Sequence, residues 1–181
     1  MSADAAELFR AHRSRLFAIA YCRQIALQAR RHVDAHRPRF ETSRAERDEL
    51  AGLFFTACQE GDTAALLELL AGDCVLYGDG GGRAPALPKP LYGSERVARA
   101  LVGFLLVANR IGARFEPLTV NGQPGGRFLS PDGGLINVVA LDIAAGMVQT
   151  VRSVVNPDKL AHLGPVADVR GLIAGRHTPD R

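Results

Sequence analysis

The sequence predicts an α+β fold in which a run of helices is followed by a curved antiparallel sheet. Between residues 43 and 109, apolar side chains recur at the spacing of amphipathic helices. Beyond Gly112 the pattern changes to short segments rich in Val, Ile, Leu and Thr, separated by turn residues. Links this short can join only antiparallel neighbours. Such a sheet is expected to curl over the helices that precede it.

The first helix of this domain is expected to begin after Ser43. Ser43 and Glu46 have the spacing of a capping box, in which each residue bonds the backbone N–H of the other. The residues that follow at the spacing of a buried helical stripe are Leu50, Leu53, Phe54, Ala57 and Cys58. Gly61 is expected to end this helix, and Asp62 to cap a second helix over residues 63–70.

A third helix is expected over residues 94–109, after a Pro-rich loop at 84–90. Ser94 is expected to cap it. Its apolar face would consist of Val97, Leu101, Phe104, Leu105 and Ala108.

Along the chain, strands are expected both before and after this third helix. A short apolar strand beginning at Val75 leads into a run of glycines. The later strands are expected at 114–120, 127–129, 135–142 and 147–155. Turn residues separate them at 121–126, 130–133 and 144–146.

Residues 1–42 are expected to form a helical arm, residues 43–173 a domain that folds alone, and residues 174–181 a tail. The arm has neither Pro nor Gly between Asp4 and His36, and Pro38 closes it. Residues 1–47 contain ten Arg against five Asp and Glu, whereas the whole chain has a formal charge of only +3. Clustered Arg can bind nucleic acid, but a solvated helix face is favoured because no DNA-binding motif accompanies it.

The cysteines and the hydropathy favour a cytoplasmic protein. The three cysteines, Cys22, Cys58 and Cys74, form no Cys-x-x-Cys pair, and an odd number gives no disulfide framework. No apolar run is long enough to cross a bilayer. We expect no membrane association, no metal and no cofactor.

The glycine run follows the first strand and has the sequence Asp79-Gly80-Gly81-Gly82-Arg83. Glycine enters positive φ without steric cost, so the run indicates a tight turn or a close backbone approach. Successive N–H groups can also cradle an anion. The turn is favoured over a phosphate loop because no Gly-Lys-Ser/Thr follows.

Two motifs carry a resemblance to a known family. The order of helices and strands resembles the cone-shaped fold of nuclear transport factor 2, ketosteroid isomerase and the SnoaL cyclases. The glycine run and Asn156-Pro157-Asp158-Lys159-Leu160 together resemble the SnoaL-like C-terminal extension of extracytoplasmic-function sigma factors of the J type. That family has Lys where Arg83 stands here, whereas the second motif matches at every position. Residues 30–40 resemble the segment that joins sigma region 4 to the extension.

The resemblance implies a truncated sigma-factor-like protein. Residues 8–17 look like the opening helix of sigma region 2, yet from about Cys22 the chain already resembles the end of region 4. The resemblance therefore implies that most of both regions are absent. The implied function is regulation of transcription initiation through protein contacts, with a sigma core or RNA polymerase as partner. Promoter recognition by this chain alone, and DNA binding generally, are not expected.

An enzyme and a ligand sensor are the alternatives, because the same fold hosts isomerases and cyclases. Asp79 would be the general base, and the other pocket candidates are Tyr77, Tyr92, Asn137 and His162. Each of these residues also has an ordinary packing or surface explanation, and fold alone does not imply catalysis. Regulation is therefore favoured over enzymatic activity, while a sensor that binds a small molecule without chemistry stays open.

Overall fold

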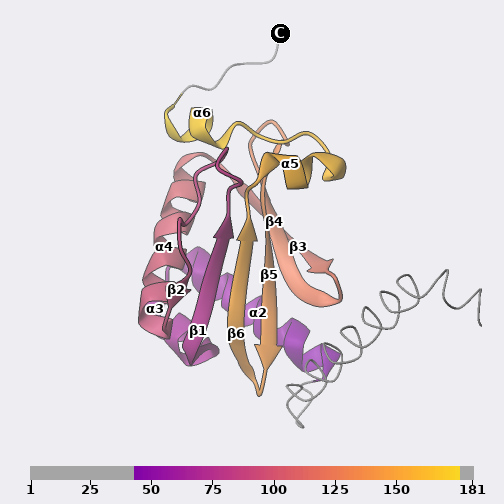
Figure 1. Cartoon of the computed structure of the whole chain (residues 1–181). Helices are drawn as coiled ribbons and strands as arrows, with labels where there is room; N and C mark the ends of the chain where they lie inside the picture. The colour runs from indigo at the N-terminus through magenta and orange to yellow at the C-terminus, as the bar shows by residue number, and fades with distance from the viewer. Residues whose placement is uncertain (1–42, 176–181) are drawn as a thin grey trace, which may run out of the picture. The chain divides into compact units, whose positions relative to one another are not determined.

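The computed structural model describes residues 43–175, which lie within the unit Thr42–Arg181. Three main helices pack on one face of a six-stranded sheet with the order β2-β1-β6-β5-β4-β3 (Figure 1). The helices precede or interrupt the strands as the sequence predicts. The arm expected at 1–42 and the last residues of the expected tail lie outside the described residues.

The first two helices form as their local sequence predicts. Helix α2, Arg44–Glu60, begins with a complete capping box: Ser43 N donates to Glu46 Oε2 at 2.7 Å, and Glu46 N donates to Ser43 Oγ at 3.2 Å. It ends at Gly61, which has φ 71°. Asp62 Oδ1 accepts from Ala65 N at 3.0 Å and caps α3, Thr63–Leu69.

The start of helix α4, Ser94–Arg110, differs from the prediction. Its N-cap is Gly93, with φ 91° and no side-chain cap, so the expected Ser94 cap is wrong. The short strand β2, Leu91–Tyr92, pairs with β1, and Gly93 N donates to Cys74 O at 2.9 Å. The chain therefore leaves the sheet at Gly93, and the positive φ needed there favours glycine.

The later strands form an antiparallel meander. They are β3, Arg114–Val120; β4, Gln123–Leu129; β5, Leu135–Ala144; and β6, Met147–Val154. Residues 123–126, expected in a turn, belong to β4. The turn before β4 needs only two residues in positive φ, Asn121 and Gly122.

The sheet is not wholly antiparallel, because β1, Leu70–Asp79, pairs in parallel with β6. The register runs from Val75 opposite Thr150 to Asp79 opposite Val154. Three short elements follow β6 and cross the end of the sheet: α5, Pro157–Leu160; the 3₁₀ turn Ala161–Leu163; and α6, Val169–Ile173 (Figure 1).

The core lies between the sheet and the helices. Its largest fully buried side chains are Phe54, Leu66, Leu70, Leu76, Val97, Leu141, Val148 and Val151. Beside it, the rings of Phe55 and Phe115 lie 4.5 Å apart, and those of Phe115 and Phe128 lie 5.2 Å apart, measured between centroids. In residues 43–175, no helix has the length and apolar character to cross a membrane.

Gly126 allows this aromatic cluster to form, and Gly126→Ala should destabilise the domain. A Cβ at this position would lie 2.1 Å from Phe115 Cε2, so the ring must move out of its stack. We expect a loss of about 1–3 kcal/mol in the free energy of unfolding, measured by urea denaturation.

Gly52→Ala is the control, because an added Cβ there meets nothing within 4 Å on helix α2. It should stabilise the protein by up to about 1 kcal/mol through helix propensity. Equal stability of Gly126→Ala and wild type would contradict this account of the cluster.

Candidate functional site

The two motifs meet at the end of the sheet. We call residues 79–83 the glycine motif and residues 156–160 the Asn-Pro motif. Parallel strands end at the same edge, so the motif after β1 lies beside the motif after β6. Val155 N donates to Asp79 O at 2.8 Å, which continues the strand pairing into the loops.

Two ion pairs join the motifs. Lys159 Nζ lies 2.7 Å from Asp79 Oδ2, and Arg83 Nη1 lies 2.8 Å from Asp158 Oδ1. The side chains of Arg83, Asp158 and Lys159 are 64%, 63% and 66% exposed, so their charges face solvent. Exposed pairs add little to stability, which leaves these groups available for contacts with another molecule.

The buried members of the Asn-Pro motif anchor it. Asn156 Oδ1 accepts from Asp158 N at 3.1 Å and caps α5, and Pro157 occupies the first turn, where its missing N–H costs nothing. Leu160 is buried against Leu129 and Leu135. The motif thus has an inner side that holds it on the sheet and an outer side that carries charge.

The glycine motif forms a turn that fits closely around Asn156. Arg83 N donates to Gly80 O at 2.9 Å, with Gly81 at φ 57° and Gly82 at φ 71°. A Cβ on Gly81 would lie 2.4 Å from Asn156 Nδ2, so glycine is required by both conformation and space. Gly81 N donates to Asp79 Oδ1 at 3.0 Å, so this N–H is already occupied within the turn.

Asp79 is stabilised in its charged form. The hydrogen bond from Lys159 is the main cause that lowers the pKa of this carboxyl group, and the Gly81 N–H and Asn156 amide act in the same direction. Asp79 therefore carries a negative charge at neutral pH, between the Lys159 ammonium group and the turn of the glycine motif.

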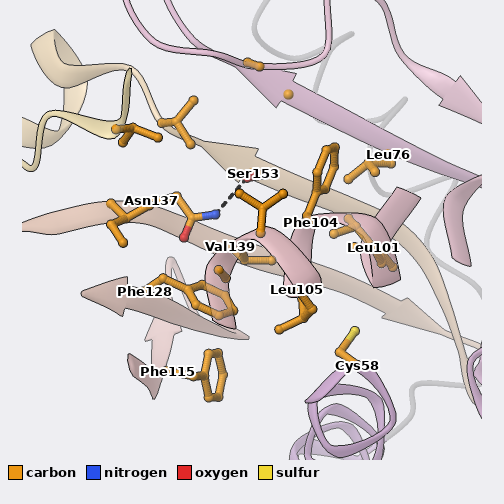
Figure 2. Close-up of a pocket in the computed structure, with 18 of the residues that line it drawn as sticks. Cys58, Leu76, Leu101, Phe104, Leu105, Phe115, Phe128, Asn137, Val139 and Ser153 are labelled. Carbon is orange, nitrogen blue, oxygen red and sulfur yellow. Dashed lines mark hydrogen bonds between the residues drawn. The ribbon is translucent and has the colours of Figure 1, made fainter. Parts of the chain in front are cut away.

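A separate apolar pocket of about 370 Å³ lies between the sheet and the helices (Figure 2). Strands β1, β4, β5 and β6 and helices α2 and α4 contribute to its wall. The side chains labelled in the close-up are Cys58, Leu76, Leu101, Phe104, Leu105, Phe115, Phe128, Asn137, Val139 and Ser153.

Of the four pocket candidates, the pocket contains only Asn137. Tyr77 is 41% exposed with the Arg152 guanidinium 5.9 Å from its ring centroid, and Tyr92 is 60% exposed. His162 is exposed in the 3₁₀ turn. These three side chains therefore do not line this pocket.

The pocket offers binding groups without evident catalytic groups. The part of its wall within residues 43–175 contains no Asp, Glu, His, Lys, Arg or Tyr. Burial raises the pKa of the Cys58 thiol to about 12, so this sulfur stays protonated and is a poor nucleophile. No group of three or more His, Cys, Asp or Glu that could hold a metal occurs in the described part of the chain.

The polar partner of Asn137 was not predicted. Asn137 Nδ2 donates to Ser153 Oγ at 3.1 Å across β5 and β6. The two strands are joined by a short turn, so their antiparallel pairing could be predicted, but the register that brings these side chains together could not.

The helices, the curved sheet and the apolar pocket between them define an α+β domain of the NTF2-like or SnoaL-like type. The chain is similar to ECF RNA polymerase sigma factor SigJ of Mycobacterium tuberculosis, with 27% identity over 173 residues. The alignment covers 87% of this chain and 53% of SigJ, so the chain spans about half the length of that relative.

Two solved structures are also similar to the chain. The crystal structure of M. tuberculosis SigJ matches with a TM-score of 0.58 and 27% identity, over 78% of this chain and 50% of SigJ. An NTF2-like protein from Burkholderia xenovorans has a TM-score of 0.44 and 21% identity, over 66% of this chain and 96% of that one. No family model matches the chain.

Gly81→Ala should destabilise the domain more than Gly82→Ala. Both substitutions place alanine at positive φ, which costs about 1–2 kcal/mol. An added Cβ meets nothing within 4 Å at Gly82 but meets Asn156 at Gly81. Thermal melting of the two variants should show the additional loss at Gly81, and equal losses would contradict the close fit to Asn156.

Asp79→Asn should lower stability at neutral pH, by up to about 1 kcal/mol because the ion pair is partly exposed. The folded-state pKa of Asp79 lies below its ordinary value of 3.8, so its contribution is present above that value and is lost as pH falls through the folded-state pKa. The gap in melting temperature between wild type and Asp79→Asn should therefore narrow as pH is lowered below 3.8.

Lys159→Met provides the matched test. It removes the main cause of the lowered pKa, so adding Asp79→Asn to it should have a smaller effect than in wild type. Additive effects of the two substitutions would mean that the pair does not stabilise the site.

Proposed function

We propose that this chain is a sigma-factor-like regulator of transcription initiation whose NTF2-like domain acts through protein contacts. The observation that carries the proposal is the assembly of the two motifs into one charged surface. Arg83, Asp158 and Lys159 are exposed, and the buried Asn156 and Leu160 anchor the Asn-Pro motif on the sheet. The similarity to SigJ over most of the chain supports the assignment.

The proposed organisation is an N-terminal arm at 1–42, the regulatory domain at 43–173 and a tail at 174–181. The arm would be a remnant of sigma regions 2 and 4, and the partner would be a sigma core or RNA polymerase. Sequence-specific promoter reading needs base-contacting elements held at a defined spacing. In this proposal the chain does not supply them and acts on a sigma core contributed by another molecule.

The pocket argues against the enzymatic alternative. General acid–base chemistry needs a titratable group within hydrogen-bond reach of the substrate, and the described wall has no carboxylate or imidazole. Asp79, the base expected for an enzyme, is instead paired with Lys159 at the motif surface. Regulation by contact requires no such group.

Charge reversal at Arg83 tests the proposed surface. Arg83→Glu should weaken binding to a purified sigma fragment that carries regions 2 and 4, in a salt-dependent way, if Arg83 contacts an acidic partner. Arg83→Glu also breaks the pair with Asp158. The double variant Arg83→Glu/Asp158→Arg restores an internal pair but places the charges at exchanged positions.

Binding measured by calorimetry separates these effects. If the surface is a contact site, the double variant should still bind the sigma fragment weakly, although its melting temperature recovers. Full recovery of binding would mean that binding depends only on the internal ion pair and not on direct contact with Arg83. Arg127→Glu is the control, because Arg127 has a similar exposed pair, with Glu116 at 2.7 Å, on β4 and β3 at the opposite edge of the sheet. Promoter-specific transcripts from core polymerase and this chain alone would contradict the proposal.

A further inference from the structure

We propose that the apolar pocket binds a small, neutral, mainly hydrocarbon molecule that carries one hydrogen-bond donor, such as a hydroxyl group on an aromatic or alicyclic skeleton. The proposal goes beyond the regulatory function and does not rest on it, because the pocket and the motif surface are built from different side chains. The volume, the lining and one buried polar atom define the ligand.

The size and lining of the pocket favour a compact hydrocarbon skeleton. About 370 Å³ lies within the usual range of small-molecule sites, which are mostly apolar with a few placed polar groups. Leu76 and Val139 line the pocket from β1 and β5, and the rings of Phe115 and Phe128 line it from β3 and β4 (Figure 2). Val151 of β6 also lines it. Flat or alicyclic skeletons match such aromatic and branched walls better than polar ones.

The single donor follows from Asn137. Its Nδ2 donates to Ser153 Oγ at 3.1 Å, whereas its Oδ1 is buried and has no hydrogen-bond partner in residues 43–175. A buried acceptor left without a partner costs free energy, so a donor on the ligand would gain by reaching it. Figure 2 shows the amide beside Phe128 and Val139, inside the apolar wall.

The ligand is neutral because the pocket does not compensate charge. The described wall holds no ionisable side chain except Cys58, whose thiol stays protonated because burial raises its pKa to about 12. A carboxylate or an ammonium group would lose its hydration there without gaining a counter-ion.

The rim of the pocket gives access from solvent. Phe104 of α4 and Ile173 of α6 line the pocket yet are 45% and 49% exposed, so they mark its mouth. Residues 85–87 of the Pro-rich loop line the same pocket. A small molecule can therefore enter between α4, α6 and this loop without unfolding the core.

The test uses the full chain and two probes of nearly equal shape, 1-naphthol and its methyl ether, 1-methoxynaphthalene. Only the naphthol can donate a hydrogen bond. In isothermal calorimetry at neutral pH, wild type should bind the naphthol about tenfold more tightly than the ether. Asn137→Leu should remove this preference, because it should weaken the binding of the naphthol and leave the binding of the ether unchanged.

Two substitutions on one helix locate the binding. Ala108 lines the pocket, and Ala108→Phe should weaken the binding of both probes because the larger side chain fills the pocket. Leu106 does not line the pocket and is 62% exposed, so Leu106→Phe should bind both probes as wild type does. Melting curves establish that each variant is folded.

Wild-type binding alone can overturn the proposal, so it stays testable if a variant fails to fold. Failure of both probes to bind folded wild type at their solubility limits would exclude the ligand class. Equal binding of the two probes, or tighter binding of the ether, would exclude the donor. No sigma fragment is present, so these results are independent of the contact test at Arg83.

Discussion

The parallel pairing of β1 with β6 is the constraint on which both candidate sites depend. It joins segments that are distant in the chain, and the pair Arg83–Asp158 beyond it spans 75 residues. At the end of these strands the pairing brings the two motifs together. Further along them it places Leu76 opposite Val151, two side chains that form the sheet wall of the pocket. One backbone arrangement thus supports a charged surface and an apolar cavity.

Local signals in the sequence predicted the helices and most strands. The capping box at Ser43, the cap at Asp62 and the apolar stripes act within a few residues, so they can be read without a structure. The Ser94 cap failed because β2 pairs with β1 and imposes the conformation of Gly93. The parallel neighbour of β6 also escaped prediction, since pairing over such a separation leaves no local pattern.

For the candidate site, too, the sequence could predict some features and not others. The resemblance could identify the two motifs, but their mutual contacts depend on the long-range pairing. Tyr77 lies outside this pocket because successive strand residues face opposite sides of a sheet. Leu76 and Gly78 line the pocket, so Tyr77 between them points away. Asn137 is the candidate that lines the pocket, whereas its contact with Ser153 depends on the register of β5 and β6.

The order of synthesis gives the β1–β6 pairing a kinetic consequence. As the ribosome makes the chain from its N-terminus, β1 emerges before α4 and the meander, and its parallel neighbour is the last strand to be made. Pairing over such a distance closes a long loop and is intrinsically slow. The nascent domain therefore exposes an unpaired edge of β1 until β6 arrives, and in this interval the edge is open to pairing with strands of other chains.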